Sequence, residues 1–313
     1  MAMTDNMLSL IKAVAENNRG NARTAAIACC AEDTSKKNAA FCKKYRDMLI
    51  TGGPQFMKLP QNISGLVKME NVSQTFIPER FYVSEREERV YEKIMQTKAV
   101  SDRLMEMRIS RPNRTLLHGE SGTGKTTFAK YIAYKMGLPF CYLNFSMLID
   151  SMMGGTAKNL FRVFGFAKQS PCVLMLDELD AISVNRSNVK EGGGSADGEI
   201  SRITITLMQE LDTLTPNVVL IAATNRLDRI DDAVLRRFPV IHKIDKLYPE
   251  EAFTMARQYA DDVNRYNNIL EFTDAEIEEC IVNEDRIVTT QSRIIDNLND
   301  FIADKIAGMG LAT

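Results

Sequence analysis

The sequence has no tryptophan, only two histidines and no apolar run long enough to cross a bilayer, although it is 313 residues long. A membrane-spanning helix needs roughly 18 or more consecutive apolar residues. The best apolar run, at 218–223, has the length of a strand. The N-terminus also lacks the basic region and long apolar core that are typical of a secretory signal. We therefore expect a cytoplasmic protein without membrane contact.

Metal-binding patterns of cysteine and histidine are missing as well. We expect reduced and mostly buried thiols, because the six cysteines show no metal-ligand spacing. They are Cys29, Cys30, Cys42, Cys141, Cys172 and Cys280. The formal net charge of −2 argues against a chain-wide field for nucleic acid or anionic lipid, although a local basic patch is compatible with it.

The N-terminal residues 1–54 carry apolar residues at helical spacing and predict a small helical bundle. Met7, Ile11 and Val14 recur with this spacing, and a Gly-Gly-Pro sequence at 52–54 ends the bundle. Residues 55–79 are mixed in composition and contain Asn, Ser and Pro. We interpret this segment as a linker.

Residues 80–247 alternate between strand and helix signals after a charged helical stretch at 84–107. Alternation of this kind is typical of an α/β domain with a parallel sheet that helices cover on both faces. Residues 248–313 have no strand signal, so we expect a helical lid there. The expected strands are 115–118, 140–143, 173–176, 218–223 and 240–244, and the expected intervening helices are 125–136, 159–168 and 200–211.

The segment GESGTGKT at 119–126 fits the phosphate-binding pattern G-x-x-x-x-G-K-[ST] and lies between a predicted strand and a predicted helix. Glycines allow main-chain N–H groups to face a phosphate, and the following helix adds the positive end of its dipole. Lys125 can reach the β- and γ-phosphates, and the hydroxyl of Thr126 can bind Mg²⁺. The predicted nucleotide-binding residues of this segment are Gly119, Glu120, Ser121, Gly122, Thr123, Gly124, Lys125, Thr126 and Thr127.

Two further predicted strands end in polar residues. Asp177 and Glu178 follow an apolar strand, where Asp177 can hold Mg²⁺ through water and Glu178 can deprotonate an attacking water. Asn225 follows the strand at 218–223 and can hold that water, because ligands bind at the carboxyl ends of parallel strands. Asp180 is better explained as a helix-start or intersubunit residue. The sequence thus predicts an ATP-hydrolysing site that uses Mg²⁺.

Four motifs in this order resemble the AAA+ ATPases, and within them the AAA proteins proper. They are GESGTGKT at 119, LMLDE at 174, AATN at 222 and DDAVLRRF at 231. The resemblance covers the chain from about residue 76 to the C-terminus. It implies a P-loop α/β domain with strand order 5-1-4-3-2, a C-terminal helical lid, and a ring, usually of six subunits, with ATP at each interface.

By this resemblance, Arg236 and Arg237 are candidates for arginine fingers that act on the ATP of a neighbouring subunit. A guanidinium suits this role, since it neutralises charge on the transferring phosphoryl group. Arg293 is similar to the sensor-2 position of the lid and is expected near the γ-phosphate. Residues 81–83 correspond to a segment that often contacts adenine, although core packing explains them equally well.

The segment 150–155 matches the first pore loop of the family, but it departs from the usual pattern. Met152 and Met153 occupy the place of the aromatic residue that grips a threaded chain. Methionine is apolar and adaptable, so these residues can still pack against varied segments. The missing aromatic residue makes local remodelling of a partner more plausible than processive unfolding. A second pore loop within 185–198 and an ordinary surface loop are equally open interpretations.

The sequence as a whole predicts a homo-hexameric ATPase that remodels or unfolds a protein partner selected by the N-terminal helices. It is similar to bacterial stand-alone AAA remodellers, including the HORMA-remodelling type of antiviral defence and the type that accompanies a separate protease. One alternative is a nucleic-acid motor or loader that uses the lysines and arginine at 36–46. Another is a slow nucleotide switch or scaffold that threads nothing.

Overall fold

The computed structural model divides the chain into two compact units, Met1–Lys58 and Leu59–Thr313. The structure describes residues 3–15, 19–33, 35, 37–39, 42–43, 46, 49, 59–61, 63–109, 111–145, 148, 155–169, 171–182, 195–216, 218–267, 270–281 and 288–308. No helix of this described part is long and apolar enough to cross a membrane. All six cysteines are free thiols, and four of them are buried.

The N-terminal unit contains helices α1 (Asp5–Ala15) and α2 (Arg19–Glu32), which pack against each other. The side chain of Asn6 on α1 donates a hydrogen bond of 2.5 Å to Glu32 on α2. The spacing of the apolar residues correctly predicted a helix, but their face is not the packed one. Ala13 is buried, whereas Ile11 and Val14 are 52% and 63% exposed.

The larger unit is built on a six-stranded sheet with the order β1-β3-β4-β5-β2-β6. The strands are β1 (Lys68–Glu70), β2 (Asn113–His118), β3 (Phe140–Asn144), β4 (Cys172–Asp177), β5 (Val218–Thr224) and β6 (Val240–Lys243). All pairs are parallel except β1 with β3. Counted from β2, the five parallel strands follow the expected order 5-1-4-3-2, and β1 adds a sixth strand beside β3.

The expected linker at 55–79 is wrong for the residues from 59 onward. This segment contains β1, the short helix α4 (Val72–Thr75) and the 3₁₀ turn η1 (Pro78–Arg80). Ile63, Val67 and Val72 are buried in the cores of the larger unit, so the segment packs as part of this unit. A strand of three residues is too short to show an alternating pattern in the sequence.

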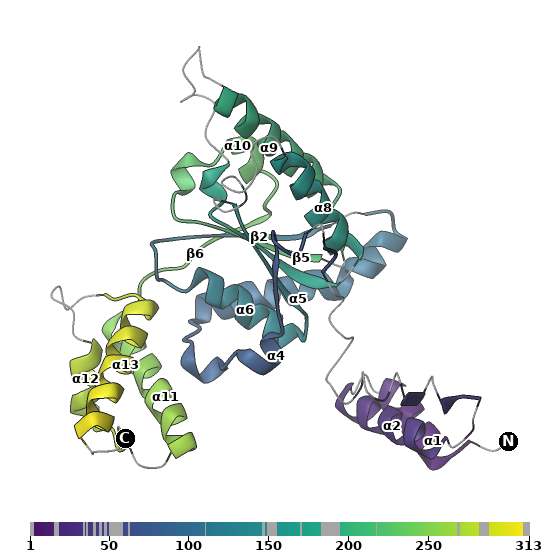
Figure 1. Cartoon of the computed structure of the whole chain (residues 1–313), viewed down its shortest axis with the longest axis horizontal. Coiled ribbons are helices and arrows are strands. Elements are labelled where there is room, and N and C mark those ends of the chain that lie inside the picture. Colours follow the sequence, from purple (N-terminus) through teal and green to yellow (C-terminus); the bar gives the residue numbers. More distant parts are fainter. Residues whose placement is uncertain are drawn as a thin grey trace. The chain divides into compact units, whose positions relative to one another are not determined.

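Helices cover both faces of the sheet (Figure 1). Helices α8 (Thr156–Gln169), α9 (Ser195–Asp212) and α10 (Asp232–Leu235) share one core, and α4, α5 (Glu85–Glu106) and α6 (Lys125–Met136) share the other. Successive strand residues point to opposite faces. Leu174 and Leu176 of β4 therefore lie in the first core, and Val173 and Met175 lie in the second.

A helical lid follows β6, as predicted. It consists of α11 (Pro249–Asn267), α12 (Asp274–Ile281) and α13 (Gln291–Gly308), the green-to-yellow helices of Figure 1. The lid has its own apolar core, in which Met255, Ile277 and Leu298 are almost fully buried. An isolated antiparallel bridge between Leu247 and Thr289 joins the start of the lid to the segment before α13.

Candidate functional site

The predicted phosphate loop lies between β2 and α6, and its shape depends on glycine. Gly122 and Gly124 have φ angles of +78° and +102°, a left-handed conformation that disfavours residues with a Cβ. A Cβ on Gly119 would come within 2.3 Å of the carbonyl oxygen of Ile244. Helix α6 starts at Lys125 directly after the loop, so the main-chain N–H groups of its first turn are suited to binding an anion.

The ammonium group of Lys125 is held inside this loop. Its Nζ donates hydrogen bonds to the carbonyl oxygens of Gly119 at 2.9 Å and Glu120 at 2.6 Å. Burial lowers the pKa of Lys125, while the carboxylates of Asp177 and Asp180 act in the opposite direction. The loop therefore presents a positive charge in a place where a phosphate can bind.

A hydroxyl and a carboxylate meet at the end of β4. Thr126 Oγ1 donates a hydrogen bond of 3.0 Å to Asp177 Oδ2, and the hydroxyl of Tyr142 donates to the same oxygen at 3.2 Å. The main-chain N–H of Glu178 donates to Asp177 Oδ1 at 3.0 Å. These oxygens fit a hydrated Mg²⁺, which prefers a few protein oxygens and keeps several waters. Burial raises the pKa of Tyr142, so its hydroxyl keeps its proton.

The backbone turns sharply at Glu178, and this turn brings two successive carboxylates into one cleft. Neighbouring residues of a strand point to opposite faces, yet Asp177 and Glu178 both line the same cleft of about 340 Å³. Glu178 has a φ of +56° and a ψ of 45°, outside the extended conformation of β4. A left-handed residue that is not glycine costs about 1–2 kcal/mol and is found preferentially at functional sites.

Asn225 also lines this cleft, directly after β5. The residue before it is fixed by a hydrogen bond of 2.6 Å from Thr224 Oγ1 to Asp180 Oδ1. Thr224 Oγ1 also accepts a hydrogen bond of 2.9 Å from the main-chain N–H of Arg226. Asp180 thus links the turn after Glu178 to the end of β5. This link fixes the segment that carries Glu178 relative to the segment that carries Asn225.

The lid supplies the opposite side of the cleft through the start of α13. Gln291, Ser292 and Ile295 line it, together with Phe81 from the segment before α5. The main-chain N–H of Ser292 donates a hydrogen bond of 3.1 Å to the carbonyl oxygen of Gly122. Arg293, the predicted sensor-2 residue, is exposed and does not line the cleft.

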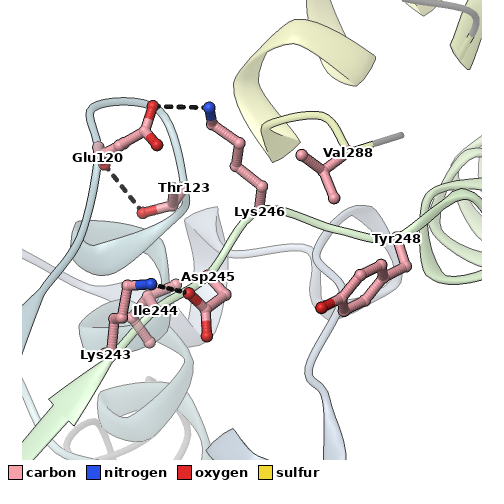
Figure 2. Close-up of a pocket in the computed structure, with 8 residues that line it drawn as sticks. All are labelled: Glu120, Thr123, Lys243, Ile244, Asp245, Lys246, Tyr248 and Val288. Atoms are coloured by element: carbon pink, nitrogen blue, oxygen red, sulfur yellow. Dashed lines mark hydrogen bonds and ion pairs between the residues drawn. The ribbon is translucent and has the colours of Figure 1, made fainter. Parts of the chain in front are cut away.

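A second cleft, of about 390 Å³, lies between the phosphate loop and the connection from β6 to the lid (Figure 2). Lys246 Nζ forms an ion pair of 2.7 Å with Glu120 of the loop, and Lys243 pairs with Asp245 at 2.6 Å. Thr123 Oγ1 donates a hydrogen bond of 3.0 Å to the carbonyl oxygen of Glu120. Glu120 and Thr123, both predicted nucleotide-binding residues, thus line this second cleft rather than the first.

The two candidate arginine fingers have different surroundings. The guanidinium of Arg237 forms a bidentate pair with Asp212 at 2.9 and 2.8 Å and also donates to the carbonyl oxygen of Ala233. The side chain of Arg236 is exposed and forms no hydrogen bond or ion pair with the residues that the structure describes. Neither arginine lines the cleft of its own chain.

Of the remaining predicted site residues, some line the first cleft and others lie outside the described residues. Ser121, Gly122, Gly124, Lys125, Thr126 and Thr127 all line the first cleft with Asp177, Glu178 and Asn225. Met152 and Met153 lie outside the described residues, as does most of the proposed second pore loop. Sequence reasoning assigned no role to the side chains of Tyr142, Thr224 and Gln291. Thr224 is the last residue of β5, and this position was the signal that could have identified it, whereas Tyr142 is the middle residue of β3.

Comparison with known proteins identifies relatives of the chain. Residues 115–246 match the family model "ATPase family associated with various cellular activities (AAA)". The chain is 30% identical over 230 residues to an AAA family ATPase of Sinorhizobium fredii, covering 71% of this chain and 67% of that protein. It is 36% identical over 186 residues to the proteasome-activating nucleotidase of Aeropyrum pernix, covering 57% of this chain and 44% of that protein.

A third relative is the 26S protease regulatory subunit 6A of Caenorhabditis elegans. It is 35% identical over 153 residues, which cover 48% of this chain and 35% of that subunit. The chain therefore spans less than half the length of either proteasome-related relative.

Proposed function

The chain belongs to the AAA family of ATPases, and on this premise we propose that it forms a homo-hexameric ring that hydrolyses ATP to remodel a partner protein. The observation that carries the proposal is the first cleft. It brings the phosphate loop, two successive carboxylates and Asn225 against the start of a lid helix. This constellation has a phosphate cradle, a cation site and a base in one place.

The phosphate loop holds the triphosphate of ATP. Main-chain N–H groups of residues 121–126 face the phosphates, and Lys125 exchanges the carbonyl oxygens of Gly119 and Glu120 for the β- and γ-phosphate oxygens. Thr126 and Asp177 hold the Mg²⁺ of the nucleotide, and the hydrogen bond of 3.0 Å between them supports this pairing. When bound, the cation neutralises charge on the phosphates.

Glu178 is the general base that deprotonates the attacking water, and Asn225 orients that water. The support for these roles is positional, because both residues line the cleft on the side of Asp177. The hydrogen bond from Thr224 to Asp180 keeps their two segments together. Because the fold already holds the base in place, little conformational entropy is lost when the base and the water reach the reactive geometry.

Arg236 completes the site of a neighbouring subunit. Its guanidinium is exposed, outside the cleft of its own chain, whereas that of Arg237 is held by Asp212. An arginine supplied by a neighbour stabilises the charge of the transition state and makes hydrolysis depend on assembly. The candidate fingers therefore have separate roles, with Arg236 catalytic in trans and Arg237 structural.

A protein is the substrate that the relatives favour. Two of them are named as a proteasome-activating nucleotidase and a 26S protease regulatory subunit, both associated with protein degradation. The N-terminal unit, with the apolar residues Ile11 and Val14 exposed on α1, is the part that selects the partner.

The test uses Glu178→Gln, which retains the shape of the side chain but cannot act as a base. We expect this variant to assemble into stable hexamers with ATP and magnesium, and sedimentation velocity measures the assembly. Lys125→Ala is the matched control, because it removes phosphate binding and should stay dissociated under the same conditions. Equal assembly of the two variants, or assembly that ignores ATP, would contradict the proposal.

A further inference from the structure

Gln291, the first residue of lid helix α13, makes a two-point contact with the main chain of Tyr82. Its Nε2 donates a hydrogen bond of 3.0 Å to the carbonyl oxygen of Tyr82, and its Oε1 accepts one of 3.3 Å from the N–H of the same residue. Gln291 is only 5% exposed. A buried amide with both of its ends satisfied is held in one orientation.

This amide also lies directly beside the phosphate loop. A Cβ on Gly124 would be 3.3 Å from Gln291 Nε2 and 3.0 Å from the ring of Phe81. Gln291 lines the first cleft, whereas Tyr82, whose main chain it contacts, does not. The side chain of Gln291 therefore stands between the cleft and the polar main-chain groups of Tyr82.

Gln291 covers the main-chain N–H and C=O of Tyr82, which together form a donor next to an acceptor. A main-chain N–H beside a C=O requires a partner with an acceptor next to a donor, and a carboxamide is such a partner. The Watson–Crick edge of adenine offers the same pair, with N1 as acceptor and the N6 amino group as donor. Guanine reverses the two roles at the same ring positions.

We propose that Gln291 is an internal competitor of the adenine base, a lid side chain that occupies the Tyr82 N–H and C=O and must leave them when ATP or ADP binds. This inference rests on the proposed function of the cleft, because the base can reach Tyr82 only when the phosphates occupy the loop.

Displacement of Gln291 also breaks one of the contacts between the lid and the larger domain. Ser292 and Gln291 are neighbours at the start of α13, and the N–H of Ser292 is bound to Gly122 in the phosphate loop. Entry of the base breaks the link to Tyr82 and leaves the link to the loop. Other contacts of the lid remain, including the ion pair of 2.7 Å between Arg80 and Asp262. Loss of the Tyr82 link changes the balance among these contacts, so base recognition becomes coupled to lid position.

The experiment measures ADP binding by calorimetry for the wild type, Gln291→Ala and Gln291→Met, all with magnesium. Gln291→Met preserves the length and packing of the side chain but removes both hydrogen bonds. We expect ADP to bind about fivefold or more tightly to both variants, because a site that is closed part of the time has a reduced apparent affinity. Asp296→Ala, an exposed position on the same helix, is the control and should leave the affinity unchanged.

Inorganic tripolyphosphate with magnesium is the decisive second probe, because it has phosphates and no base. Its affinity should be the same in the wild type and in both Gln291 variants. Unchanged or weaker ADP binding in the variants would overturn the inference, as would tripolyphosphate binding that tightens as much as ADP binding. A wild type that binds neither probe would refute the nucleotide site itself, which is a different failure.

Thermal unfolding separates competition from simple support of the lid. Without nucleotide, Gln291→Met should melt below the wild type, because the Tyr82 groups have lost their partner. With saturating ADP the two melting temperatures should converge, since the base then fills the same place in both proteins. A melting difference that stays the same with and without ADP would assign Gln291 a purely structural role.

Discussion

The two sides of the first cleft differ in how they are anchored. One side consists of the phosphate loop and the carboxyl ends of β4 and β5, which continue directly into the buried strands of the sheet. The other side is the start of α13, which reaches the larger domain through the Ser292 N–H and the Gln291 amide. The sheet side therefore suits chemistry that needs fixed geometry, and the lid side suits control of access.

The largest effect on ATPase rate is expected when the sheet side of the cleft loses the arginine of a neighbouring subunit. Arg236→Ala should lower the ATPase rate by about 10³-fold while ADP affinity stays unchanged, since an arginine finger acts only on the transition state. Steady-state phosphate release measures the loss. Arg237→Ala is the matched variant, and it should chiefly lower the melting temperature by freeing Asp212.

Mixing the inactive variants tests whether Arg236 acts in trans. Arg236→Ala subunits have an intact cleft, and Glu178→Gln subunits have an intact arginine and are expected to assemble. Mixed rings of the two should recover part of the activity, because some clefts then face a neighbour that supplies Arg236. Rings that stay inactive at every mixing ratio would contradict this role.

A smaller loss is expected when the sheet side loses its phosphate contact. Lys125→Ala should weaken ADP binding about 100-fold, because each hydrogen bond to a charged group contributes roughly 1.5–3 kcal/mol. Titration calorimetry with ADP and magnesium gives the affinity. Lys130→Ala, on the same helix but paired with Glu70, is the control, and an equal loss there would point to a damaged helix instead.

Tyr142 refines the sheet side further. Tyr142→Phe removes the hydrogen bond of 3.2 Å to Asp177 and should raise the magnesium concentration for half-maximal ATPase rate by about threefold to tenfold. A magnesium titration at saturating ATP measures this shift. Tyr134→Phe serves as the comparison, because the Tyr134 ring packs against Phe76 away from the cleft. Equal shifts of this magnesium concentration in both variants would show that the Tyr142 hydroxyl does not support magnesium binding.

The smallest effect is expected for the ion pair between Glu120 and Lys246 at the lid connection (Figure 2). Glu120 is largely exposed, and exposed ion pairs contribute at most about 1 kcal/mol. Lys246→Ala should change ADP affinity by less than about fivefold, and added salt should remove even that difference. A large effect that persists at high salt would show that the lid connection, and not only α13, controls access.

The sheet side of the cleft is also the part that the sequence predicts best. Glycines in a fixed pattern and polar residues after apolar strands are local signals, so the loop, Asp177, Glu178 and Asn225 could be predicted, and most of these residues line the first cleft. The strand order agreed with the family resemblance apart from β1, which has three residues and no detectable alternation.

The lid side could not be predicted in the same way, because it depends on helix phase and packing. Residues 291, 292 and 295 of α13 share the face that lines the cleft, while Arg293 lies on another face. Arg293 was predicted as the sensor-2 residue because it is a basic residue at the start of a lid helix. The orientation of that helix, however, is set by the packing of Ile294 and Leu298 into the lid core. Likewise, Asp212 lies 25 residues before Arg237, so their pairing needs the tertiary fold.

The role proposed for Glu178 is in the chemical step and not in binding, and the variant Glu178→Gln separates these two possibilities. ADP affinity and ATPase rate should be measured on the same preparation of this variant and of the wild type. We expect a nucleotide affinity within about threefold of the wild type and a turnover that falls by at least about 100-fold. A variant that retains its turnover, or that loses turnover only because it no longer binds nucleotide, would show that Glu178 is not the general base.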